Sequence, residues 1–250
     1  MISTPVISLE NLTVTYDRHP AVHHVRGCFQ AGSLTAIVGP NGAGKSTLMK
    51  AIVGLLAPAG GGIRYAGIDR RRDVAYLPQQ AEIDRSFPIT VADTVVTGCW
   101  QEIGAFGRVT SAQWRRVAEA LSAVGLDGFG RRLIGTLSAG QFQRALFARL
   151  LLQKASVILL DEPFNAIDAR TTADLLALVQ RWHGEEKTII AVLHDFDQVR
   201  ACFPQTLLLA RELIDWGPTE DVLIPANLLM MRQMAERWAD DADTCSRNWD

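Results

Sequence analysis

The chain has 250 residues, of which 48% are hydrophobic, and its formal net charge is −2 at pH 7. This length fits one large domain or two intimately joined domains, and the near-neutral charge argues against the basic face of a nucleic-acid-binding protein. Arg149 and Lys154 interrupt the most apolar region, so no run reaches the roughly 18 apolar residues that span a bilayer. The four cysteines form no C-x-x-C pair, which argues against a structural zinc site and fits a reducing cytoplasm.

The first third of the chain is predicted to hold strands around one helix. Residues 1–10 have the pattern of a strand and lack the basic start and apolar core of a secretion signal. The histidine-containing stretch 19–24 is expected to be a solvated turn without a bound metal. Residues 34–38 are an apolar run typical of a buried strand, and residues 45–56 are predicted to be a helix. The three glycines at 60–62 predict another turn.

The middle of the chain, from about residue 87 to 153, is predicted to be mainly helical. Thr90 caps one helix, Ser111 precedes a second, and Ser138 caps a third that ends near Gln153. These helices stand between two parts in which strands recur. We therefore expect a helical subdomain inserted into an α/β core.

Strands and helices alternate again from Val157 onward. Apolar residues near helical spacing predict a final helix over 226–238, and the residues after it are expected to be mobile. We expect the α/β domain to cover residues 1–225. Residues 226–250 would form a C-terminal helix and a flexible tail.

A complete phosphate-binding loop follows the strand at 34–38. Its pattern G-x-x-x-x-G-K-S stands between a strand and a helix, as this kind of loop requires. Glycines let backbone N–H groups curl around an anion, and the helix start adds a positive dipole end. Lys45 is placed to reach the β and γ phosphates, and the Ser46 hydroxyl to bind Mg²⁺. The predicted nucleotide-binding residues of this loop are Gly39, Pro40, Asn41, Gly42, Ala43, Gly44, Lys45, Ser46 and Thr47.

Two acidic residues follow another buried strand. Asp161 and Glu162 come directly after the apolar run 157–160. Ligands of α/β sheets bind at the carboxyl ends of strands, where the phosphate loop also lies. We expect Asp161 to hold Mg²⁺ through water, and Glu162 to orient and deprotonate an attacking water. The alternative is a charge pair at the start of the next helix.

His194 and Ser138 are weaker candidates when each is taken alone. His194 follows the apolar run 188–193, at a strand end where a histidine is often structural. Ser138 and Gln141 have the spacing of a capping box, which often marks only a helix start. A helix start with exposed amides around Gly140 is nevertheless a second anion site. Because the chain has one phosphate loop, two anion sites indicate a shared nucleotide.

The chain resembles ATP-binding cassette (ABC) proteins up to about residue 224. Its motifs stand in the order of that family: the phosphate loop, Tyr76-Leu77-Pro78-Gln79, Leu137-Ser138-Ala139-Gly140-Gln141, Ile158-Leu159-Leu160-Asp161-Glu162-Pro163, Asn165-Ala166-Ile167-Asp168 and His194. Ala139 departs from the usual glycine, but alanine is the smallest possible change and we expect little harm. The resemblance implies a P-loop NTPase fold with a mainly parallel core sheet, an N-terminal antiparallel β subdomain and the inserted helical subdomain.

The resemblance also implies a dimer that shares its nucleotides. Two cassettes pair head to tail, and each ATP lies between the phosphate loop of one copy and the Ser138 motif of the other. The implied contacts of that motif come from Ser138, Gly140 and Gln141. Asp168 would act across the dimer interface.

The remaining roles follow from the same resemblance. Gln79 would contact Mg²⁺ or the attacking water, and His194 would contact the γ-phosphate and the water, so both join Glu162 as catalytic candidates. The implied Mg²⁺ ligands are Ser46, Gln79 and Asp161. Tyr16 would stack on adenine, although a tyrosine near a strand end packs against the core about as often.

A further resemblance concerns the kind of transporter. Residues 87–96 are similar to the corresponding segment of ATPases from zinc and manganese importers. The other reading, that its valines pack the helical insert, can hold at the same time. The implied protein is an ATP-hydrolysing subunit, peripheral on the cytoplasmic face of a bacterial inner membrane. A homodimer would act on integral membrane permeases, and through them with an extracytoplasmic solute-binding protein, without nucleic acid. Candidates for the groove that receives a permease helix are Phe87, Trp100 and Phe106.

Other proteins would carry the same catalytic residues. An ATPase of a different ABC importer or exporter remains open. A soluble ABC ATPase acting on ribosomes or DNA is a second alternative, but such proteins usually carry two cassettes or long coiled-coil arms in one chain, and neither occurs in this sequence. A small-molecule kinase would leave the Ser138 motif without a purpose.

Overall fold

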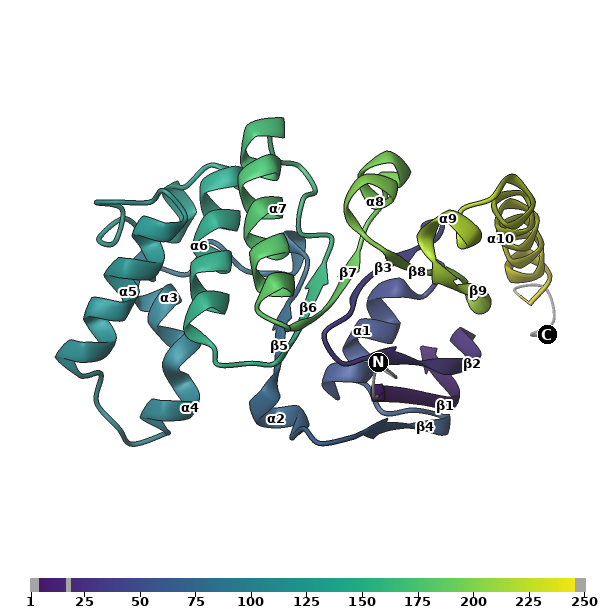
Figure 1. Cartoon of the computed structure of the whole chain (residues 1–250), viewed down its shortest axis with the longest axis horizontal. Coiled ribbons are helices and arrows are strands. Elements are labelled where there is room, and N and C mark those ends of the chain that lie inside the picture. The colour runs from purple at the N-terminus through teal and green to yellow at the C-terminus, as the bar shows by residue number, and fades with distance from the viewer. Residues whose placement is uncertain (1–4, 17–18, 246–250) are drawn as a thin grey trace. The chain divides into compact units, whose positions relative to one another are not determined.

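The computed structural model describes residues 5–16 and 19–245, and it divides into two compact units (Figure 1). The first unit contains Met1–Ile68 and Ile190–Asp250, and the second contains Asp69–Ile189. The boundary between them falls inside strand β7 (Thr188–Val192). Among the helices of the described residues, none combines the length and apolar character needed to cross a membrane.

The first unit contains an antiparallel sheet and a mixed group of strands. The antiparallel sheet has the order β2-β1-β4, and the mixed group has the order β7-β3-β8-β9, in which β3 and β8 are parallel and β9 is antiparallel to β8. The elements are β1 (Pro5–Tyr16), β2 (His19–Gln30), β3 (Leu34–Val38), α1 (Lys45–Val53), β4 (Gly60–Tyr65), α8 (Phe196–Cys202), β8 (Gln205–Ala210), β9 (Glu212–Pro218), α9 (Thr219–Val222) and α10 (Pro225–Cys245).

Two predicted turns of the first unit are wrong. The stretch 19–24 belongs to strand β2, because its pairing with β1 buries Val22 against the core. The glycines at 60–62 begin strand β4. Gly61 has φ +68°, and a Cβ there would lie 2.1 Å from the Asn11 carbonyl oxygen, so glycine is required by close strand pairing.

Two helices of this unit end elsewhere than predicted. Helix α1 ends at Val53 rather than residue 56, because Gly54 adopts a left-handed conformation and caps it. Helix α10 continues to Cys245 rather than ending near residue 238, so the expected mobile tail is helical up to that point.

The second unit combines short strands with a group of helices. Its strand order is β5-β6-β7, and β5 pairs in parallel with β6. The further elements are α2 (Arg70–Asp73), β5 (Val74–Leu77), η1 (Gln80–Glu82), α3 (Val91–Val96), η2 (Thr97–Cys99), α4 (Trp100–Ile103), α5 (Ser111–Ala123), η3 (Ile134–Thr136), α6 (Ala139–Leu152), β6 (Val157–Asp161) and α7 (Ala169–Gly184).

Helix α6 forms the centre of this unit. It lies between α5 and α7 in Figure 1 and contacts both, as well as α3 and β5. Phe147 of α6 is fully buried and stacks on Trp182 of α7, with ring centroids 5.7 Å apart. An aromatic pair of this kind fixes how two helices pack.

Helix caps of the second unit largely follow the sequence prediction. Thr90 and Ser138 cap α3 and α6, which confirms both predictions. Helix α5 is capped by Thr110, one residue before the predicted Ser111, in a capping box with Gln113.

Candidate active site

The phosphate loop between β3 and α1 is held by close backbone contacts within the first unit. A Cβ at Gly39 would lie 2.0 Å from the Leu209 carbonyl oxygen, so only glycine fits there. The Arg211 N–H, in the turn between β8 and β9, donates to the Ala43 carbonyl at 3.0 Å. Gly44, directly before α1, has a left-handed φ of 87°. The end of β8 and the turn after it therefore hold the phosphate loop in place.

The other side of the loop is open and carries donors. Gly42 has φ +76°, and a Cβ there would meet no atom within 4 Å. Lys45 is only 5% exposed, and its Nζ donates to the carbonyls of Gly39 and Pro40, both at 2.9 Å. A nearly buried ammonium next to the N–H groups of a helix start favours an anion. The residues of the loop thus fit a polyphosphate, and their part in binding one stays a prediction.

His194 lies beside the strand that leads into this loop. The Leu193 N–H donates to the Ile37 carbonyl at 3.1 Å, so the ends of β7 and β3 are neighbours in the first unit. His194 itself is exposed, and the carboxylate of Asp195 after it caps α8. The backbone of His194 is therefore fixed on both sides while its ring reaches the surface.

Three further candidates of the first unit are placed as follows. Ser46 is half-buried in the first turn of α1, and Thr47 is buried at 9% exposure. Tyr16 is the last residue of β1, where its backbone pairs with His19. The side chain of Tyr16 lies outside the described residues, so its adenine contact stays a prediction.

The second unit brings Gln79 and Asp161 to one sheet edge. Leu77 pairs with Leu160 in the parallel register of β5 and β6, so both strands end at the same level. Asp161 is 1% exposed, and its Oδ2 accepts a hydrogen bond from the Tyr76 hydroxyl at 3.2 Å. A carboxylate and an amide oxygen are hard oxygen donors of the kind that Mg²⁺ prefers. The chemistry of these donors fits the predicted metal.

Glu162 occupies a tight turn after β6. Its φ of 50° is left-handed, which is uncommon for a residue with a side chain and occurs often at functional sites. Asn165 Nδ2 donates to Glu162 Oε2 at 3.1 Å, and the Asn165 N–H donates to the Glu162 carbonyl at 3.2 Å. Helix α7 begins only at Ala169, so a charge pair in its first turn does not explain Glu162.

The start of α6 lies against the start of α7. Ser138 is exposed and forms the predicted capping box with Gln141, with hydrogen bonds of 3.1 and 3.2 Å. A Cβ at Gly140 would lie 3.3 Å from Thr171 Oγ1 and 3.4 Å from Asp168 Oδ2, which leaves little room for any other residue. The second unit therefore brings the Ser138 motif and Asp168 together.

Asp168 caps α7 and is held as a carboxylate. The Thr171 N–H and the Thr171 hydroxyl donate to its two oxygens, each at 2.8 Å. These bonds, the backbone one first, lower the pKa of Asp168 below its ordinary value.

Three residues of the second unit that had no predicted role form hydrogen bonds with the candidates or with their neighbours in the chain. Tyr76 and Asn165 bond Asp161 and Glu162 as described, and Gln143 is a buried amide in α6. A hydroxyl in a buried strand, and a glutamine within an apolar helix face, are the signals that could have pointed to them.

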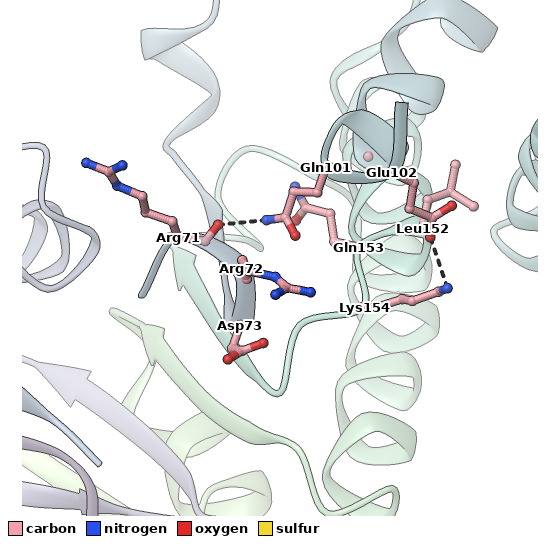
Figure 2. A pocket seen from close by; sticks show the side chains of 9 residues that line it. Arg71, Arg72, Asp73, Gln101, Glu102, Leu152, Gln153 and Lys154 are labelled. Carbon is pink, nitrogen blue, oxygen red and sulfur yellow. Dashed lines mark hydrogen bonds and ion pairs between the residues drawn. The ribbon is translucent and has the colours of Figure 1, made fainter. Parts of the chain in front are cut away.

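The three residues predicted to form the docking groove are all exposed. Phe87, Trp100 and Phe106 are 63%, 59% and 101% exposed, and their role in docking stays a prediction. A cavity of about 500 Å³ lies at α2, α4 and the end of α6, and most of the residues that line it are charged or carry an amide. Figure 2 shows its residues, with a hydrogen bond from the Gln101 side-chain amide to the Arg71 carbonyl at 2.7 Å and an ion pair between Lys154 and Glu102 at 3.1 Å. The lining residues are Arg71, Arg72, Asp73, Gly98, Gln101, Glu102, Leu152, Gln153 and Lys154.

A phosphate loop between a strand and a helix, with an acidic pair after a buried strand, defines a P-loop nucleotide-binding protein. The chain belongs to the ABC transporter family, whose model matches residues 22–165. Within that family it is an ATP-binding subunit that hydrolyses ATP, which confirms the predicted class of fold and activity.

Relatives and solved structures resemble most of the chain. The manganese transport system ATP-binding protein MntB of Halalkalibacterium halodurans is 42% identical over 232 residues, which cover 88% of this chain and 89% of that protein. The manganese transport system ATP-binding protein MntA of Synechocystis is 37% identical over 252 residues, covering 94% and 96%. A dimeric bacterial ABC transporter cassette matches with a TM-score of 0.75 and 26% identity, over 85% of this chain and 98% of that one.

Proposed function

We propose that the chain is the ATP-hydrolysing subunit of a bacterial manganese importer. The observation that carries this proposal is the likeness, over most of both chains, to two ATP-binding proteins of manganese transport systems. Zinc, which the sequence left as an equal possibility, has less support because both of those relatives are manganese proteins.

The proposed chemistry assigns one task to each group. The amides of the phosphate loop and Lys45 bind the phosphates, and Ser46, Gln79 and Asp161 hold Mg²⁺, which neutralises developing charge on the phosphates when it is bound. Glu162 accepts a proton from the attacking water. Its turn supports this task, because Asn165 orients the carboxylate at 3.1 Å. His194 holds the γ-phosphate.

In the proposed assembly two copies share each nucleotide. Ser138, Gly140 and Gln141 of one copy contact the ATP held by the phosphate loop of the other, and Asp168 acts across the interface. The short distances around Gly140 support this proposal, since they keep the Ser138 motif and Asp168 in one place. The dimeric cassette to which the chain is similar supports it as well.

The proposed membrane partners are two permease subunits, which work with an extracytoplasmic solute-binding protein. The chain would then lie at the cytoplasmic face of the membrane. We propose that the docking surface lies at α4, where Trp100 is exposed and where Gln101 and Glu102 line the cavity of Figure 2. Arg71 and Arg72 on that surface would suit a helix with acidic residues, whereas Lys154 is already paired with Glu102.

Transport by the purified complex tests the proposal. The tagged chain is purified with the membrane proteins that bind it, and the complex is reconstituted in vesicles with Mn²⁺ and ATP. We expect ATP-dependent accumulation of Mn²⁺, which the Glu162→Gln variant loses. ATP hydrolysis with uptake of Zn²⁺ but not Mn²⁺ would contradict the proposal that the transported ion is manganese. A complex that hydrolyses no ATP would contradict the proposal that the chain is an ATP-hydrolysing subunit.

A further inference from the structure

Gln143 is a polar side chain in the core of the second unit. It lies on α6 and is only 1% exposed. A buried amide is costly unless both of its ends are hydrogen-bonded. Both ends of Gln143 are: Oε1 accepts from Gln80 Nε2 at 2.6 Å, and Nε2 donates to the Pro163 carbonyl at 2.7 Å.

The two partners of Gln143 are the chain neighbours of proposed catalytic residues. Gln80 follows Gln79, and Pro163 follows Glu162. Gln80 Nε2 also donates to the carbonyl of Ala139 at 3.3 Å, within the Ser138 motif. One buried amide therefore joins three motifs of the second unit that lie far apart in the sequence.

We infer that Gln143 is a positioning residue for ATP hydrolysis, which fixes Gln79 and Glu162 relative to each other and to the Ser138 motif. This inference rests on the proposed roles of those residues. Gln143 touches neither of the two side chains and acts through the backbone next to them. Hydrogen bonds of a buried network are directional and strong, and a shift of about 1 Å at a reacting group costs about 100-fold in rate.

The variant Gln143→Met tests this role, because methionine keeps the length of the side chain and removes both hydrogen bonds. We expect kcat for ATP hydrolysis to fall about 10- to 100-fold. The Kd for ATP of the monomeric subunit, measured without hydrolysis, should change by less than about 3-fold, because the partners of Gln143 are Gln80 and Pro163 and not residues of the phosphate loop.

Gln113→Met is the matched control. Gln113 is also a buried glutamine of this unit, at 9% exposure, but its Oε1 accepts from the Thr110 N–H at 2.8 Å and only caps α5. This variant should lose thermal stability and keep its kcat. If Gln113→Met lowers kcat as much as Gln143→Met, the effect is a general loss of folding and the inference is overturned.

Gln80→Met gives a second and independent measurement. Gln80 lies in a partly exposed turn, so this variant decides the question even if Gln143→Met does not fold. It should also lower kcat, and the double variant should be about as slow as the slower single variant, because both interrupt one network. Effects that multiply, or wild-type kcat in folded variants, would overturn the inference while the wild type still hydrolyses ATP. A wild type without ATP hydrolysis would instead overturn the proposed function.

Discussion

Replacing Gly44 by alanine tests how tightly the phosphate loop is held. Gly44 has φ +87°, and an added Cβ would lie 2.0 Å from the Ala21 carbonyl oxygen, whereas real Cβ contacts stay above 3.0 Å. A left-handed conformation destabilises a residue with a side chain by about 1–2 kcal/mol. Overpacking adds about 1–3 kcal/mol, since backbone must move. We therefore expect Gly44→Ala to lower the free energy of unfolding by about 2–5 kcal/mol.

Gly42→Ala is the control in the same loop. Its φ of +76° is equally left-handed, but the added Cβ would meet nothing within 4 Å. Only the conformational term of about 1–2 kcal/mol applies. Its methyl group would nevertheless project from the open side of the loop, where we propose that phosphate binds. This variant should therefore stay folded and lose affinity for ATP.

Thermal unfolding without nucleotide, followed by circular dichroism, compares the two variants. The two variants should differ by about 1–3 kcal/mol in the free energy of unfolding. For a chain of this size, each kcal/mol shifts the unfolding temperature by about 2–4 °C. Gly44→Ala should thus unfold at a clearly lower temperature than Gly42→Ala. Equal unfolding temperatures would refute the tight contact between the loop and the strand that carries Ala21.

Three other outcomes are expected. Glu162→Gln should slow hydrolysis about 10²- to 10⁴-fold with unchanged ATP binding, and wild-type turnover would contradict its role as a base. Lys45→Ala should lose about 3–4 kcal/mol of transition-state stabilisation, measured as kcat/KM. Mixing this variant with Ser138→Ala should restore hydrolysis, because each mixed dimer contains one intact site. No gain in hydrolysis on mixing would contradict the sharing of sites between two copies. Hydrogen bonds lower the pKa of Asp168 below its ordinary value of 3.8. The free energy of unfolding of the wild type should therefore exceed that of Asp168→Asn above pH 3.8, and the difference should shrink as the pH falls below that value. A difference that does not change with pH would contradict the shift.

Motifs with short sequence spacing were predicted well. The phosphate loop and the caps at Thr90 and Ser138 depend on residues at most a few positions apart, so local backbone chemistry determines them. The resemblance to ABC proteins rests on the same motifs and is confirmed by the family match. The domain limits at 87–153 and 225, and the role of each site residue, stay predictions.

Elements that depend on distant partners were predicted less well. The glycines at 60–62 have the composition of a turn, but pairing with β1 makes them a strand and requires Gly61 to approach Asn11. The stretch 19–24 became a strand for the same reason. In both cases tertiary pairing outweighs local propensity.

The sequence by itself determined which residues could bind phosphate, because the spacing of glycines, Lys45 and the helix start is a property of one continuous segment. Tertiary structure alone decided what surrounds the other candidates. Nothing near Gln143 in the chain indicates that its amide lies between Gln80 and Pro163. Its burial follows from the packing of α6 within the second unit, and hydrogen bonds between segments that are distant in the sequence exist only once that packing has formed.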